Sequence, residues 1–149
     1  RRNSRSPLCH IKSLGYLDNM LARAEAVGLG SDEAILLNED ELVAECSASN
    51  IFIVEEGGLV TPAVDTGILE GVTRGVVIEL ACGLGIAVAE ESIGVGRLFG
   101  AEEVFATNSI IELVPVISID GKNVGAGVNS KTTGMLAQAY RDLALSGLR

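Results

Sequence analysis

Two separated stretches of this sequence could bind the two ends of one ligand. Glu45 closes a run of apolar and small residues, where an unpaired buried carboxylate is costly and needs a cationic or protonated partner. Gly71-Val72-Thr73 opens a helical pattern and offers backbone N–H groups and a hydroxyl to an anion. A ring with a basic nitrogen and a phosphate would satisfy both stretches, and pyridoxal phosphate (PLP) is such a ligand.

PLP chemistry also requires a lysine amine. The chain has three lysines, Lys12, Lys122 and Lys131. Lys12 stands just before a helical pattern, where the positive end of the helix dipole disfavours a protonated ammonium and so favours a neutral nucleophile. The alternatives are a solvated lysine in a loop and, for Glu45, an edge-strand glutamate facing water.

The pattern of apolar residues predicts the elements that position these groups. Helices are expected at 14–27, 71–84 and 131–145, with Ser13 capping the first and Gly28 and Gly30 ending it. Strands are expected at 34–38, 42–46, 50–54, 59–61, 86–89, 103–107 and 110–119, with a hairpin turn at Asp120-Gly121 and a short helix or turn at 92–98. The early strands read as an antiparallel meander, so the sequence predicts a mixed α+β fold.

The stretch 45–74 resembles the signature of the class IV aminotransferases, the PLP enzymes of fold type IV. The matching residues are Glu45, Ser47, Asn50, Phe52, Thr61, Leu69, Gly71 and Arg74. The segment 11–26, which contains Lys12, is similar to the lysine segment of that family. The resemblance implies the large domain of fold type IV, an antiparallel meander or pseudo-barrel sheet with flanking helices. Residues 1–8 would then be a linker from a missing N-terminal domain, and 9–149 the PLP-binding C-terminal domain.

The resemblance also implies roles for single residues. Lys12 would form the Schiff base and carry the proton, Glu45 would hold the pyridine nitrogen, and Leu69 would pack on the ring. The phosphate would be held by Gly71, Val72, Thr73, Asn108 and Ser109, and the substrate would lie near Asn108 and Ile110. Arg74 is equally a candidate structural partner for an acidic residue.

The implied function is transfer of an amino group to a 2-oxo acid from an amino acid of the branched-chain or D-amino-acid type. One alternative is 4-amino-4-deoxychorismate lyase, which releases pyruvate and 4-aminobenzoate. A second is a remnant that binds PLP or a partner without catalysis. Relatives form homodimers, so a homodimer is expected by resemblance.

Composition argues against several other classes of protein. A net charge of −9 argues against binding nucleic acid or anionic membrane surfaces, and we see no run of about 18 apolar residues as in a membrane span. Cys9, Cys46 and Cys82 lack metal-binding spacing, so no metal is expected. They read as reduced thiols of a cytoplasmic protein.

Overall fold

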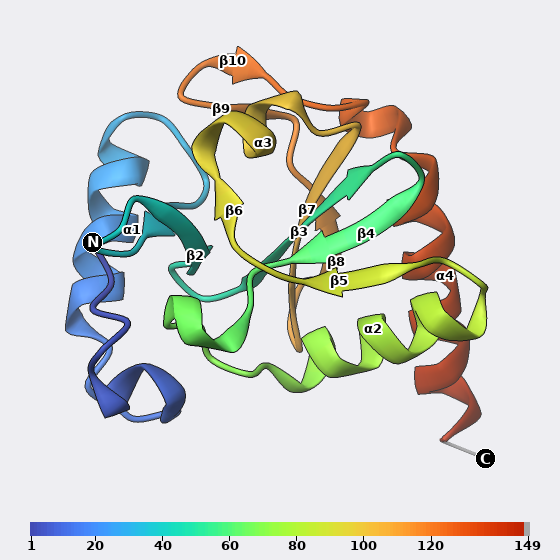
Figure 1. Cartoon of the computed structure of the whole chain (residues 1–149), viewed down its shortest axis with the longest axis horizontal. Coiled ribbons are helices and arrows are strands. Elements are labelled where there is room, and N and C mark those ends of the chain that lie inside the picture. The colour runs from blue at the N-terminus through green and yellow to red at the C-terminus, as the bar shows by residue number, and fades with distance from the viewer. Residues whose placement is uncertain (148–149) are drawn as a thin grey trace.

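Two β-sheets and the apolar cluster between them form the centre of the computed structural model, which describes residues 1–147 (Figure 1). The smaller sheet has the order β1 (Ile35–Leu37), β2 (Leu42–Cys46), β6 (Ile93–Gly94). The larger has the order β5 (Val88–Glu90), β4 (Gly58–Thr61), β3 (Asn50–Glu55), β7 (Glu103–Asn108), β8 (Glu112–Pro115). The hairpin of β9 (Ser118–Ile119) and β10 (Lys122–Asn123) is paired with neither sheet, although Ile119 packs against the apolar cluster.

The central strand β3 is buried on both faces. Ile51 and Ile53 point into the cluster between the two sheets, whereas Phe52 and Val54 point to the opposite face. There Phe52 stacks on Phe105 of β7, with ring centroids 5.0 Å apart. Because both faces are covered, β3 reads in the sequence as a continuous apolar run.

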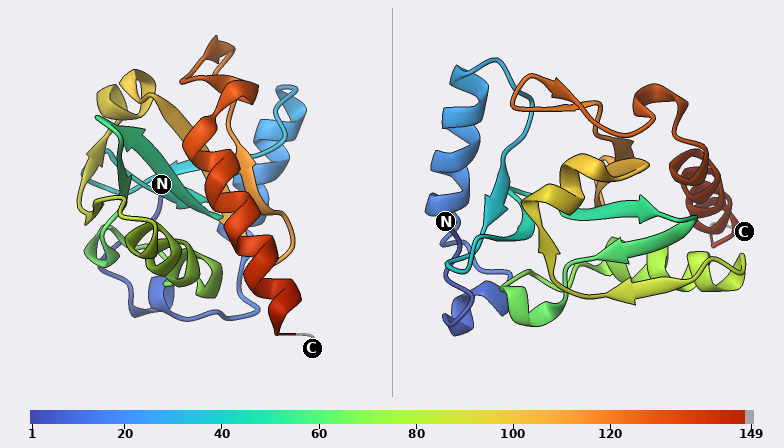
Figure 2. Two further views of the ribbon diagram at one scale, coloured as in Figure 1. Left: turned by 90° about the vertical axis from the view of Figure 1, so that its right-hand side faces the viewer. Right: turned by 45° about the horizontal axis from the view of Figure 1, so that its top comes forward.

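Two helices cover the face of the larger sheet that carries Phe52. The helices of the chain are α1 (Leu17–Gly28), α2 (Val72–Gly83), α3 (Val95–Gly100) and α4 (Lys131–Ser146), with short 3-10 turns η1 (Pro7–His10), η2 (Val64–Thr66) and η3 (Gly127–Asn129). α2 and α4 pack on that face through Val77, Ala81, Leu136 and Ala137. α1 lies at the opposite end of the molecule, beside the N-terminus (Figure 2).

The mixed α+β class is confirmed, but a single antiparallel meander is wrong. β2 and β3 belong to different sheets, because both edges of β3 are already paired with β4 and β7. β4 and β5 run parallel, joined through α2. The two sheets do not close into a barrel within the described chain.

Several element boundaries also differ from the prediction. α1 begins only at Leu17, and Ser13 does not cap it, because the Ser13 hydroxyl instead accepts from the Gly15 N–H and closes an earlier turn. The predicted strand 110–119 is divided into β8 and β9. The turn at 120–121 is confirmed, with positive φ at both residues, and 92–98 contains a short strand as well as the start of a short helix.

We find no helix in residues 1–147 with both the length and the apolar character needed to cross a membrane.

Candidate active site

Glu45 lies near the end of β2 and is buried, with 3% of its surface exposed. β6 pairs only with the first two residues of β2, and η2 contacts the same strand. The carboxylate oxygen Oε2 accepts a hydrogen bond from the Leu69 N–H at 2.8 Å. Glu45 therefore points into a covered site, as the sequence predicted, and not into water.

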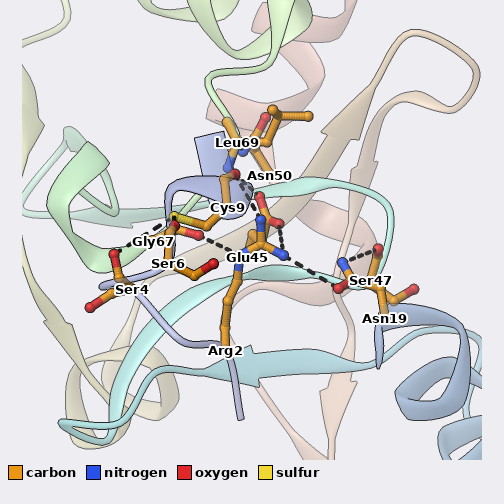
Figure 3. A network of polar contacts seen from close by, with 10 residues as sticks. All are labelled: Arg2, Ser4, Ser6, Cys9, Asn19, Glu45, Ser47, Asn50, Gly67 and Leu69. Carbon is orange, nitrogen blue, oxygen red and sulfur yellow. Dashed lines mark hydrogen bonds and ion pairs between the residues drawn. The ribbon is translucent and has the colours of Figure 1, made fainter. Parts of the chain in front are cut away.

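The second oxygen of Glu45 is left without a donor. Oε1 lies 3.0 Å from a guanidinium nitrogen of Arg2, but the contact lacks hydrogen-bond geometry, and no group in residues 1–147 donates to it (Figure 3). Burial raises the pKa of Glu45 to about 7, against the lowering effects of the Leu69 N–H and of the charges of Arg2 and Lys12. A buried acceptor without a donor is costly, so this atom is suited to a ligand that carries a proton.

Asn50, the first residue of β3, holds the segment that follows η2. Its side-chain amide donates to the Leu69 carbonyl at 2.8 Å, so Leu69 is fixed from both sides, by Glu45 and by Asn50. A Cβ added at Gly71 would come within 2.2 Å of the Asn50 Oδ1. The glycine in the motif is therefore required by this close approach, and Asn50 is a positioning residue that the sequence analysis placed only in the signature.

α2 begins directly after this segment, with Gly71 as its N-cap. Among residues 1–147 no side chain caps this end of α2, and its first turn holds no acidic residue. Val72 is exposed and Thr73 is buried. The N–H groups of the first turn are therefore available to an anion, as the sequence analysis expected.

Two residues of the segment before α1, Lys12 and Tyr16, interact electrostatically with the same carboxylate. Lys12 is exposed, and its charge lowers the pKa of Glu45. Tyr16 is half-buried, and burial, followed by the Glu45 charge, raises its pKa. The structure thus joins Glu45 to the start of α2 through Leu69–Gly71, and the charge of Lys12 acts on the same carboxylate. That the three hold one ligand stays a prediction.

Asn108 is the last residue of β7, and Ser109 and Ile110 lie in the turn that leads to β8. The Asn108 amide donates to the Ala48 carbonyl at 3.0 Å and to the Ser49 hydroxyl at 2.9 Å. Its Oδ1 accepts from the N–H groups of Ile110 and Ile111. Asn108 therefore ties this turn to the β2–β3 connection next to Asn50, while Ser109 and Ile110 are exposed. Their contacts with a phosphate or substrate stay a prediction.

Arg74 has a structural partner, one of the two roles considered for it. It is buried and donates to the Glu90 carboxylate at 2.6 Å and to the Pro62 carbonyl at 3.0 Å. Within the described chain its Nε has no acceptor. These bonds fasten α2 to the end of β5 and to the β4–η2 connection.

The first residues, expected to be a linker, are bonded to the domain. Arg2 makes a bridge beside Asn38, and Ser4 donates twice to the Glu39 carboxylate at 2.9 Å. The sequence analysis missed Arg2, and only its basic type, which a buried glutamate requires, could have drawn attention to it. A connection of residues 1–8 to a further domain stays a prediction.

These residues fit PLP. Glu45 Oε1 lacks the proton donor that a protonated pyridine nitrogen would supply. The start of α2 offers donors that suit a phosphate. Lys12 supplies an amine whose charge acts on the same carboxylate. We find no group of His, Cys, Asp and Glu in residues 1–147 that could hold a metal ion.

Comparison with known proteins agrees with this geometry. Residues 1–119 match the model of the family described as amino-transferase class IV. This match covers most of the chain, so the chain belongs to the class IV aminotransferase family.

Named relatives in this family act on different amino acids. The chain is 39% identical to the branched-chain-amino-acid aminotransferase of Pseudomonas aeruginosa over 128 residues, 86% of this chain and 41% of that protein. It is 42% identical to the D-alanine aminotransferase of Listeria monocytogenes over 132 residues, 89% of this chain and 45% of that protein. The chain thus spans about half the length of these relatives.

A solved structure extends the likeness to the fold. The branched-chain amino acid aminotransferase of Thermobaculum terrenum in its PLP form is 36% identical, with a TM-score of 0.91 over 96% of this chain and 47% of that one. The fold type IV assignment is therefore confirmed by both sequence and structure.

Proposed function

We propose that this chain is the PLP-binding part of an aminotransferase that moves an amino group from an amino acid of the branched-chain or D-amino-acid type to a 2-oxo acid. The observation that carries the proposal is Glu45, whose Oε2 is bonded to the Leu69 N–H while Oε1 has no donor in the described residues. The named relatives support the reaction class, since they are branched-chain and D-alanine aminotransferases.

Each residue would then have one task. When bound, PLP supplies an electron sink for the negative charge formed at the substrate α-carbon. The Lys12 Nζ would remove the proton from that carbon, Glu45 Oε1 would accept a hydrogen bond from the pyridine nitrogen, and the N–H groups of Val72 and Thr73 would donate to the phosphate. Leu69, held between Glu45 and Asn50, would pack on the ring.

The whole protein would act on small molecules, as a homodimer in the cytoplasm. Three free cysteines, Cys9, Cys46 and Cys82, agree with a reducing compartment.

The test is addition of PLP to the apo chain, followed by absorbance. We expect a visible band that borohydride removes in the wild type, no band in Lys12→Ala, and an unchanged band in Lys122→Ala, the matched control. A wild-type chain that stays colourless would point to a remnant without PLP chemistry.

Substrate assays then separate the reactions. Branched-chain amino acids and D-alanine, each with 2-oxoglutarate, are expected to give glutamate. Release of pyruvate from aminodeoxychorismate without an amino acceptor would point instead to the lyase.

A further inference from the structure

Arg2 makes more hydrogen bonds to the domain than a linker residue would need. Its backbone N–H donates to the Leu37 carbonyl at 2.8 Å, beside β1. Its guanidinium donates to the carbonyls of Gly67 and Cys9 and to the Asn19 Oδ1, at 2.9 Å for Cys9 and 3.3 Å for Asn19. Only 10% of the side chain is exposed. Three separate segments therefore fix the position of this one cation (Figure 3).

The same guanidinium faces the free oxygen of Glu45. Arg2 Nη1 lies 3.0 Å from Oε1, in a contact that supplies charge without a hydrogen bond. Three of the five N–H groups of Arg2 are bonded to Gly67, Cys9 and Asn19, so acceptors other than Glu45 set the orientation of the guanidinium. The oxygen stays available as an acceptor, while the nearby positive charge favours its ionised form.

The surroundings of Glu45 make this charge necessary. Among the described residues, Arg2 and the Leu69 N–H contact it, and Lys12 and Tyr16 from the segment before α1 interact with it electrostatically. Of the two cations, Lys12 is exposed, and under the proposed function its amine would be joined to the cofactor, which leaves Arg2 as the permanent charge. A carboxyl that had become protonated could not balance a pyridinium.

We infer that Arg2 is a positioning residue for the cofactor site, which favours the ionised form of the Glu45 carboxylate and keeps its Oε1 directed toward the ring nitrogen of PLP. The inference rests on the proposed function for the identity of the ligand. It does not depend on that function for the effect of Arg2 on Glu45, which exists in the apo chain.

The test measures the titration of the Glu45 side-chain carboxyl carbon by NMR in the apo chain. We expect a midpoint near 7 in the wild type and a rise of roughly 1–3 pH units in Arg2→Met. Arg2→Lys keeps the charge and should restore most of the shift, while Arg1→Met removes a cation whose pair with Glu41 is exposed and should change nothing. If Arg2→Met does not fold, Arg2→Gln, which can still donate to a carbonyl, takes its place.

A second arm separates the inference from the proposed function. PLP is added to each variant, and its affinity is read from absorbance as a function of pH. We expect Arg2→Lys to bind PLP about tenfold more weakly than wild type, because lysine lacks the planar fork of donors. An unchanged Glu45 midpoint in Arg2→Met would overturn the inference, whereas the expected shift without any PLP binding would overturn only the proposed function.

Discussion

Residues 1–147 contain two buried glutamates, Glu45 and Glu103, and only one of them has donors for both carboxylate oxygens. Glu103 of β7 is 6% exposed and accepts three bonds from the start of α4, from the Thr132 N–H at 2.9 Å and from the Thr133 N–H and hydroxyl at 2.8 Å. Glu45 of β2 is 3% exposed, accepts one N–H, and keeps one oxygen without a donor in residues 1–147. Burial of a carboxylate alone therefore does not mark a functional site.

The pKa values of the two carboxyls follow this difference. Burial raises the pKa of Glu103, but the donors of Thr133, Thr132 and Lys131 outweigh it, so the net pKa is lowered. Burial of Glu45 outweighs its single N–H and the charges of Arg2 and Lys12, so its pKa rises to about 7. Glu103 is fully bonded, whereas Glu45, the proposed partner of a ligand, keeps part of its desolvation cost in the apo chain.

The two helix N-termini show the same contrast. α4 has its first turn closed by Glu103, and α2 has no side-chain cap from the described residues. The uncapped end lies next to the unsatisfied carboxylate, since the segment Leu69–Gly71 joins them. The uncapped N-terminus of α2 and the Glu45 oxygen without a donor together define the candidate site.

The largest expected effect comes from removing the satisfied carboxylate. Glu103→Ala leaves the first N–H groups of α4 without their acceptor and should lower the free energy of unfolding by about 2–4 kcal/mol. Urea denaturation at neutral pH measures this loss. Glu45→Gln is the matched variant, and we expect it to be neutral or stabilising in the apo chain at pH 8. A larger loss for Glu45→Gln than for Glu103→Ala would reverse the comparison.

The second largest effect is expected in the pH dependence of stability, to which Glu45 and Glu103 contribute with opposite signs. The folded pKa of Glu45 lies above its ordinary value of 4.5, so its contribution is fully present below 4.5 and is lost as the pH rises to about 7. The free energy of unfolding should fall by about 2–3 kcal/mol across that window. Glu103 has a lowered pKa, so its contribution is present above 4.5 and is lost as the pH falls through the folded pKa.

Urea denaturation from pH 4 to 8 checks the sign for Glu45. Glu45→Gln should remove the decline between 4.5 and 7, while Glu103→Gln should leave that decline in place. A wild-type curve that is flat over this window would show that Glu45 is not held in the state described here.

Substitution of Gly71 tests the connection between Glu45 and the N-terminus of α2. Gly71→Ala places a Cβ 2.2 Å from the Asn50 Oδ1 and should cost about 1–2 kcal/mol, since Asn50 must give up its bond to the Leu69 carbonyl. Gly75→Ala is the control, because a Cβ there meets nothing within 4 Å and should stabilise α2 by about 0.5–1 kcal/mol. Thermal unfolding of both variants shows whether each substitution lowers or raises the free energy of unfolding. Equal effects of the two substitutions would contradict the role of Asn50.

The smallest effect is expected at the exposed counterpart of Arg2. Arg1 pairs with Glu41 at 2.8 Å, but both side chains are more than half exposed. Arg1→Ala should therefore change the free energy of unfolding by less than about 1 kcal/mol. Urea denaturation of Arg1→Ala beside Arg2→Ala measures the difference, and similar losses would mean that burial of the Arg2 pair is unimportant.

The sequence was sufficient for the features that depend on local pattern. The motif residues Glu45, Asn50 and Gly71 were found because the signature fixes their spacing, and β2 and β4 follow apolar runs with turn residues between them. The role of Arg2 could not be found in this way, because its contacts with Gly67 and Glu45 join segments far apart in the chain. The meander was wrong for a similar reason, since pairing depends on which edges of β3 are already occupied.

The structural role of Glu103 could not be predicted from the sequence. In the sequence it looks like an ordinary strand glutamate, and nothing local indicates that α4 will begin against it. A buried carboxylate can be recognised as structural or functional only after its donors are known. The family signature drew attention to Glu45 and does not include Glu103.

The central claim is that Lys12, Glu45 and the start of α2 hold one PLP molecule between them. The most direct measurement is mass spectrometry of the peptides after PLP is added and the complex is reduced with borohydride. The account predicts a single label on the peptide that contains Lys12, with its amount reduced in Glu45→Gln. A label on Lys122 or Lys131, or one on Lys12 that is indifferent to Glu45→Gln, would contradict it.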